Sequence, residues 1–251
     1  MKNTLFFLFV LLCFSMTAQD APDAKPIMFE SIILDPNPQS LMQLRENLRN
    51  HNMKYHGEEG PYQAYVYNIA TGPNVGKLVW MMGPCGFEDL DNRPSAEGHD
   101  EDWVQNVVAH LNGVEHGEYW ERDNDLSREM TGEQYPMYYI RYHNISRTEG
   151  YRAGALLKKI SATMKTIDMA SSWAVYDNLM RQGYETGRHI AMVSGMKTWA
   201  EMNDNWGFVK AFEAIHGENS FPGFQQEMQD VITNSWDEIW VFDPYMSGRE
   251  E

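Results

Sequence analysis

Two stretches of this chain, about 110 residues apart, follow the same pattern. The first, "GKLVWMMGPCGFEDLDN", spans residues 76–92, and the second, "GRHIAMVSGMKTWAEMND", spans residues 187–204. A further match in the same order pairs "VYN" at 66–68 with "VYD" at 175–177. A period this long indicates a duplicated domain, because solenoid repeats are only about 20–45 residues long.

Each copy opens with a predicted strand followed by a predicted helix. "MFESIILD" at 28–35 and "MYYIRYHN" at 137–144 are rich in β-branched and aromatic residues, which is typical of strands. Leucines at 41, 44 and 48 then fall on one helical face, and apolar residues at 153–164 repeat with the same period. Both copies therefore begin as β-α.

The rest of each copy adds two strands, a helix and a last strand. Paired strands are predicted on either side of glycine-containing turns, and an amphipathic helix follows each pair. "GEYWER" and "DEIWVFD" are the predicted closing strands, and a short extra helix is expected from Phe224 to Ile232. The order β-α-β-β-α-β, present twice, is that of the ferredoxin-like unit.

This order leaves one face of each four-stranded sheet without helices, and a bare apolar face needs a partner. We expect the copies at 27–122 and 136–246, with a linker at 123–135, to pack sheet to sheet. The predicted class is α+β: two tandem ferredoxin-like repeats forming an α+β barrel within one chain, a monomer with an internal pseudo-dimer.

Two such units in one chain resemble the dimeric α+β barrel superfamily in fused form. That group includes NIPSNAP-like, EthD-like and antibiotic-biosynthesis-type monooxygenase proteins, and "AMVSGMKTWAEMND" looks like its passage from the third strand to a helix. The resemblance covers nearly all of the chain after the N-terminus, as pattern only. It implies a cleft between the halves, in which haem is one conceivable cofactor, but it carries over no catalytic residue.

The N-terminus predicts export. Lys2 precedes an apolar run from Leu5 to Phe14, and Ala18 then offers a small residue before Gln19, which is the layout of a signal peptide at 1–18. We therefore expect a secreted or periplasmic protein. The run is too short to span a bilayer, and no later run is longer. The net charge of −16 argues against nucleic acid and anionic membranes as partners.

The candidate ligand site comes from strand alternation. In "MYYIRYHN", Tyr139, Arg141 and His143 share one face, and we expect that face to point into the space between the sheets. Glu30 occupies the matching face of the first copy and is expected to pair with Arg141. His189, which opens a strand of the second copy, is a further candidate.

These residue types suit a small anionic or phenolic ligand. Arg141 would anchor an anion, and His143, the one candidate for catalysis, would transfer a proton near neutral pH. The alternative is a structural interface with satisfied polar groups, or an ion pair between Arg141 and Glu30.

No metal site is predicted. His51 and His56 lie near Glu58 and Glu59, but their spacing matches no known ligand set, and solvated loop polarity is the favoured interpretation. No cofactor is predicted from the residues themselves.

Three functions stay open: a cofactor-independent oxygenase or isomerase, a binding protein that uses the same cleft without turnover, or a non-enzymatic structural protein of the cell envelope whose barrel interior is filled. A large cleft with converging polar groups would favour the first two.

Overall fold

The computed structural model describes residues 27–57, 59–93, 97–129, 132–168, 172–180, 182–183, 185 and 187–249. The expected signal peptide at 1–18 lies outside these residues, so export stays a prediction. Within the described part of the chain, no helix is both long enough and apolar enough to cross a membrane.

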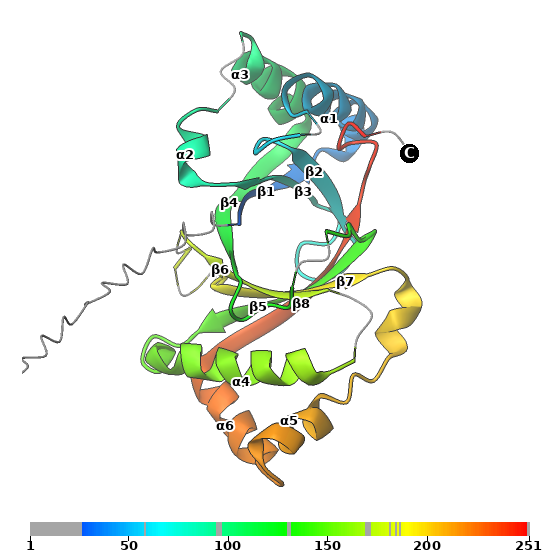
Figure 1. The fold of residues 1–251 in the computed structure, drawn as a ribbon. Helices are drawn as coiled ribbons and strands as arrows, with labels where there is room; N and C mark the ends of the chain where they lie inside the picture. Colours follow the sequence, from blue (N-terminus) through cyan, green and yellow to red (C-terminus); the bar gives the residue numbers. More distant parts are fainter. Residues whose placement is uncertain are drawn as a thin grey trace, which may run out of the picture.

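The strands form a closed antiparallel barrel (Figure 1). Their order around it is β1-β3-β2-β8-β5-β7-β6-β4. The strands are β1 (Met28–Pro36), β2 (Ala64–Ile69), β3 (Leu78–Cys85), β4 (Leu111–Asp123), β5 (Met137–Ile145), β6 (Trp173–Asn178), β7 (Ile190–Met196) and β8 (Ile232–Phe242).

The helices of the two halves lie on opposite sides of the barrel (Figure 1). In both halves a long helix follows the first strand. The helices are α1 (Leu41–Tyr55), α2 (Phe87–Leu90) and α3 (His99–Asp102) in the first half, and α4 (Ala153–Thr166), α5 (Phe208–His216) and α6 (Phe221–Val231) in the second.

Two strand pairs between the halves close the barrel. β2 pairs with β8, where Tyr67 lies opposite Phe242, and β4 pairs with β6, where Trp120 lies opposite Asn178. Each half keeps the ferredoxin-like strand order, 4-1-3-2, and the last strand of one half pairs with the second strand of the other. These pairings therefore satisfy the backbone N–H and C=O groups of the edge strands that an isolated half would expose.

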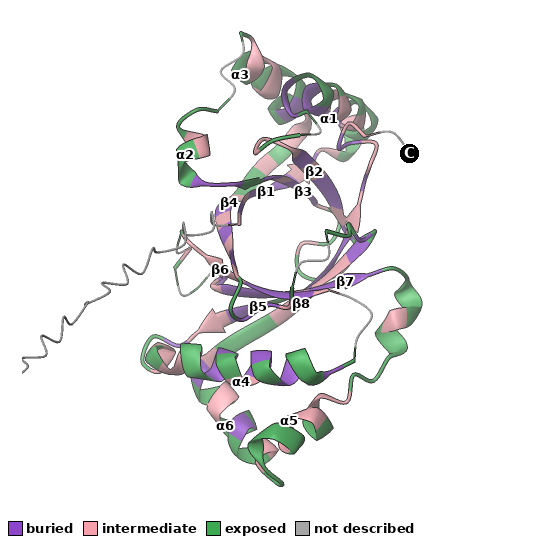
Figure 2. Ribbon diagram, in the orientation of Figure 1, coloured by how far each residue is buried: buried purple, intermediate pink, exposed green. Residues whose placement is uncertain are grey.

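Much of β1, β3 and β7 is buried, whereas the first part of β4 and of β8 includes exposed residues (Figure 2). Between sheet and helices lie two separate cores, one around Leu44 and Leu48 of α1 and the other around Ile160 of α4 and Phe212 of α5. A third apolar cluster, which includes Trp120 and Trp240, occupies the barrel interior.

The predicted fold class is confirmed: the chain is an α+β protein with two ferredoxin-like halves in one barrel. The second helical segment of the first half differs from the expectation, because α3 passes into a π-helical turn at Trp103–Val107 and a 3-10 turn at Val108–His110. The extra helix predicted at 224–232 is α6, which begins earlier, at Phe221. Duplication as the origin of the two halves stays a prediction.

Candidate functional site

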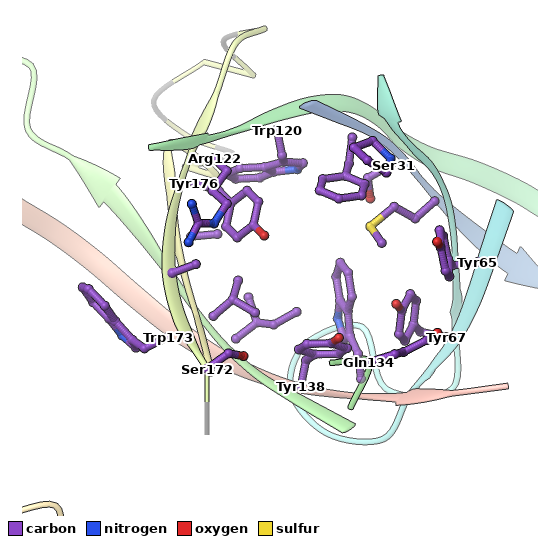
Figure 3. Close-up of a pocket in the computed structure, with 18 of the residues that line it drawn as sticks. Ser31, Tyr65, Tyr67, Trp120, Arg122, Gln134, Tyr138, Ser172, Trp173 and Tyr176 are labelled. Carbon is purple, nitrogen blue, oxygen red and sulfur yellow. The ribbon is translucent and has the colours of Figure 1, made fainter. Parts of the chain in front are cut away.

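The barrel encloses a cavity of about 330 Å³. Figure 3 shows aromatic rings around it that come from both halves. This volume lies at the lower end of the range for small-molecule sites, roughly 300–1,000 Å³. Aromatic and aliphatic side chains dominate the interior lining: Phe29, Tyr65, Tyr67, Met81, Trp120, Tyr138, Ile140, Tyr142, Tyr176, Ala191, Val193 and Trp240.

Strand β4 runs along the cavity and sets its polarity. Glu118, Trp120 and Arg122 alternate with outward residues, so they share the inner face and span about 13 Å. Trp120 and Arg122 line the cavity itself. Glu118 lies at the inner end, where it is fully buried.

A buried ion pair occupies that inner end. Arg188 donates from Nε and Nη2 to the two carboxylate oxygens of Glu118, at 2.7 and 2.9 Å. The guanidinium carbon lies 4.0 Å from the ring centre of Tyr142, a cation–π contact. Both charged side chains are almost completely buried, at 1% and 0% exposure. The pair therefore fixes the inner end of the lumen and neutralises the carboxylate there.

The opposite end is polar and opens to solvent. Arg122 lies there, and its two Nη atoms donate to Asn124 Oδ1 and to the backbone oxygen of Arg128. The exposed Glu129 and Glu133 also border this mouth. The mouth thus carries charges of both signs.

Tyrosine hydroxyls supply most of the polarity inside. Tyr65 donates to Gln63 Oε1 at 2.9 Å, and the hydroxyl of Tyr138 accepts from the backbone nitrogen of Tyr135 at 3.3 Å. Burial raises the pKa of Tyr176 to about 12 and that of Tyr67 well above its usual value. These phenols stay neutral near pH 7 and can act as hydrogen-bond donors to a ligand.

The expected orientation of β5 is wrong. Tyr138, Ile140 and Tyr142 face the lumen, whereas Tyr139 and Arg141 border a groove of about 1150 Å³ on the outer side, together with residues of α5. The more apolar face of β5 was expected to pack against the helices. The lumen is also apolar, and that face packs there instead.

The expected pairing of Arg141 is also wrong. Arg141 donates from Nε and Nη2 to the carboxylate of Asp237, at 2.7 and 2.9 Å, and from Nη2 to the hydroxyl of Tyr139 at 2.6 Å. Glu30 belongs to the other half, where it pairs with Arg93 at 2.7 Å and accepts from Tyr119. The structure therefore separates Glu30 from Arg141.

The two candidate histidines occupy different surroundings. His143 is buried with Nδ1 2.7 Å from Ser235 Oγ, and its burial, with Arg141 nearby, lowers its pKa to about 4. It is thus neutral at pH 7, not poised to exchange a proton there as expected. His189 accepts from the backbone nitrogen of Ile145 through Nδ1 at 3.0 Å. Ligand binding by Tyr139, Arg141 and His143 stays a prediction, now for the outer side.

The sequence carried a signal for the lumen that strand alternation alone did not reveal. The pattern Glu-x-Trp occurs in both closing strands, as Glu118–Trp120 and Glu238–Trp240. In each copy the indole Nε1 donates to the glutamate two residues before it, at 3.0 and 2.8 Å. A tryptophan with a carboxylate two residues before it indicates a buried strand face, because the ring packs against apolar side chains while its N–H needs a hydrogen-bond acceptor.

Comparison with known proteins gives a fold but no family. No family model and no curated protein matches the chain. Among solved structures it is similar to an anthrone oxidase-like protein, with a TM-score of 0.54, 11% identity, and coverage of 88% of this chain and 92% of that one.

Two further solved structures align with this chain over similar lengths and at similarly low identity. A candidate monooxygenase from Lactobacillus acidophilus aligns with a TM-score of 0.51 and 9% identity over 87% of this chain and 94% of its own. A chlorite dismutase variant from Candidatus Nitrospira defluvii aligns at 0.52 and 7% identity over 89% and 94%. At these identities the shared property is the dimeric α+β barrel fold.

Proposed function

We propose that the barrel binds a small aromatic molecule in its lumen. The observation that carries this proposal is the cavity of about 330 Å³, which is enclosed by aromatic side chains from both halves (Figure 3). Its lining includes neutral tyrosine hydroxyls. Apolar walls with a few hydrogen-bonding groups are typical of small-molecule sites. An aromatic ligand would stack on Trp120 or Trp240 and accept hydrogen bonds from tyrosine hydroxyls.

The charges favour a neutral aromatic molecule over an anion. Of the described residues that line the cavity, Arg122 is the one cation, and neighbouring oxygens already accept from both of its Nη atoms. Two carboxylates lie at the same mouth: Glu133 is paired with Lys197 at 2.8 Å, and Glu129 would repel an anion.

Oxygenation of the bound molecule is the second function that we propose, and the names of the similar structures support it. Activation of a phenol or enol without a cofactor requires loss of a proton. The carboxylates among the described lining residues, Glu129 and Glu133, are at the mouth, so the reacting group would have to face outward. The interior tyrosines, with pKa values raised by burial, are not bases near pH 7.

Haem fits the described lining poorly. Haem iron is held in proteins by histidine, cysteine, methionine or tyrosine. No histidine or cysteine is among the described residues around the cavity, where only Met81 and the tyrosines could serve as ligands. The lumen therefore offers haem no histidine or cysteine ligand among the described residues.

A binding experiment tests the lumen directly. Titration with 1-naphthol should quench the fluorescence of Trp120 and Trp240 in a saturable way. Ala191→Phe, which places a ring inside the cavity, should abolish the quenching. Ala200→Phe, an equal change at an exposed position, should leave it intact. Saturable binding that survives both Ala191→Phe and Val193→Phe in folded protein would overturn the proposal, and so would the absence of binding to wild type.

Anthrone and dissolved oxygen test the chemistry. Catalysed conversion of one anthrone and one O2 to anthraquinone and water should exceed the background rate in wild type and fall to background in Ala191→Phe. Binding of 1-naphthol without any anthrone oxidation would favour a binding protein over this oxygenase.

A further inference from the structure

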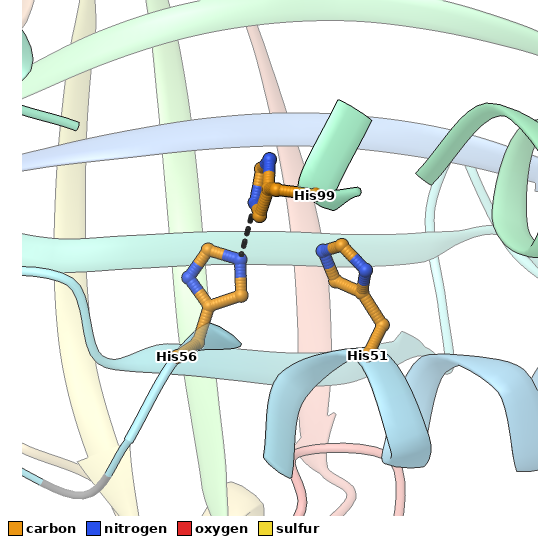
Figure 4. A group of neighbouring side chains, drawn as sticks. All are labelled: His51, His56 and His99. Carbon is orange, nitrogen blue, oxygen red and sulfur yellow. Dashed lines mark hydrogen bonds between the residues drawn. The ribbon is translucent and has the colours of Figure 1, made fainter. Parts of the chain in front are cut away.

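Three histidines far apart in the sequence meet in the first half, outside the barrel (Figure 4). His51 is on α1, His56 follows its last residue, and His99 begins α3. One ring nitrogen of each lies within 4.8 Å of one ring nitrogen of both others. Histidine is the commonest protein ligand for transition metals, and three imidazoles with an open position are a known zinc ligand set.

In all three rings, Nδ1 faces a hydrogen-bond acceptor. The Nδ1 atoms of His51, His56 and His99 lie 2.7, 3.0 and 2.9 Å from Asp102 Oδ2, the Tyr62 backbone oxygen and Asp100 Oδ1. A carboxylate or carbonyl at Nδ1 holds the hydrogen there and leaves Nε2 with a free lone pair. Partners of this kind stand behind the histidine ligands of metal sites.

With the hydrogen of each ring on Nδ1, the contact between His56 Nε2 and His99 Nε2 that is dashed in Figure 4 has no donor. His56 Nε2 and His99 Nε2 are 3.4 Å apart, which is close to the edge of a tetrahedron with metal–nitrogen bonds of about 2.0–2.1 Å. His51 Nε2 is buried and has no hydrogen-bond partner among the described residues. In Figure 4 one nitrogen of His51 faces the other two rings. Lone pairs that face one another this closely repel unless a cation or proton lies between them.

Helix α4 shows what this position holds when no histidine is needed. Its buried face carries Leu157, Ile160, Ser161 and Met164, at the spacing of Leu48, His51, Asn52 and Tyr55 in α1. His51 thus occupies, at 1% exposure, a core position whose counterpart in α4 is the aliphatic Ile160. Burial of a polar nitrogen without a partner is destabilising, so packing alone would favour the aliphatic side chain.

We propose that His51, His56 and His99 bind one zinc-class divalent metal ion through their Nε2 atoms. Asp102 and the backbone of Tyr62 orient two of the rings. The His99 side chain is 20% exposed and marks the side from which the ion enters. Three protein ligands leave a fourth position for water or another small ligand. The buried Tyr55 hydroxyl, which has no hydrogen-bond partner among the described residues, borders the cluster next to Gly98.

The site is separate from the lumen. Trp80 of β3, whose ring centre is 5.0 Å from that of His56, belongs to the core between sheet and helices, not to the barrel interior. The metal proposal therefore does not rest on the proposed ligand of the lumen.

The test uses full-length protein from which any histidine tag has been removed. After treatment with chelator, addition of excess Zn²⁺ and desalting, wild type should retain about one Zn²⁺ per chain. One equivalent of Co²⁺ should produce visible bands typical of four- or five-coordinate nitrogen sites. His99→Ala should lose both signals, whereas His216→Ala, at an exposed histidine of α5, should keep them.

Asp102→Asn adds a graded readout, because loss of such an orienting carboxylate weakens metal binding about 10–100-fold. Circular dichroism checks the fold of each variant, and His99→Gln replaces His99→Ala if the alanine variant is misfolded. No retained Zn²⁺ in wild type, or equal retention in folded His99→Ala and His99→Gln, would overturn the proposal.

Discussion

The ion pair between Arg188 and Glu118 should be the most costly single polar contact to break. Replacement of Arg188 by Met keeps much of the side-chain volume beside Tyr142 but leaves the carboxylate of Glu118 buried without its cation. Exposure of 1% and 0% for the two side chains puts this contact in the class for which removal of one partner costs about 3–5 kcal/mol. At about 2–4 °C per kcal/mol for a chain of this size, the melting temperature should fall by about 6–20 °C.

The measurement is urea unfolding followed by tryptophan fluorescence, with a second pair as control. Arg141 and Asp237 have the same two-bond geometry, but their side chains are 48% and 40% exposed, so Arg141→Met should cost only about 0–1 kcal/mol.

The double variant isolates the charge effect. Glu118→Gln in the Arg188→Met background removes the unpaired charge, while the amide can still accept from Trp120 Nε1. It should be more stable than Arg188→Met alone. A cost below about 1 kcal/mol for Arg188→Met, or strict additivity of the two changes, would refute the reasoning.

Four further outcomes are expected. Burial and the nearby Glu30 raise the pKa of Cys85 to about 11, so its thiol should resist alkylation at pH 8 in native protein and react at once in urea. The pKa of His143 is lowered to about 4 from an unfolded value near 6.5, so its contribution to stability should be complete above pH 6.5 and be lost as the pH falls towards 4. In His143→Asn, the free energy of unfolding should therefore fall less steeply over this pH range. Arg141→Ala should leave 1-naphthol binding unchanged, since Arg141 lies outside the lumen; a loss would return it to the ligand site. N-terminal sequencing of exported protein should begin near Gln19, and an intact Met1 in the soluble cytosol would contradict export.

The sequence contained enough information for the fold because local patterns and the long period agreed. The strands predicted at 28–35 and 137–144 are β1 and β5, and alternation correctly grouped Tyr138 with Ile140 and Tyr142. Which group faced inward was not decidable from polarity. The lumen and the helix-covered side of the barrel both contain apolar clusters, so the more apolar face of a strand can pack on either side.

The partners of charged residues were beyond local reasoning. Arg141 meets Asp237 because β5 and β8 are neighbours in register, and nothing within either strand specifies that register. The histidine cluster was missed for the same reason, since α3 brings His99 back to a helix that ends more than 40 residues earlier. Spacing along the chain detects a metal site only when its ligands share one segment, as in most sequence motifs.

Features that both halves share are explained by the barrel, whereas features of one half alone indicate a different role. Both halves keep the Glu-x-Trp contact, and an asparagine amide donates to each glutamate, from Asn178 to Glu118 and from Asn74 to Glu238. These contacts recur in both halves, on the last strand that each half contributes to the closed barrel.

The histidines have no such counterpart. The face of α4 that covers its sheet with Ile160 and Met164 shows that an aliphatic surface is sufficient for packing on this sheet architecture. The first half instead buries His51 and Tyr55, each with one polar atom lacking a partner among the described residues. Because these groups reduce stability unless something binds them, their presence in one half alone favours a ligand there over a structural role shared by the fold. Zinc should accordingly raise the melting temperature of wild type and leave that of His99→Ala unchanged; equal shifts in both would assign the metal to another site.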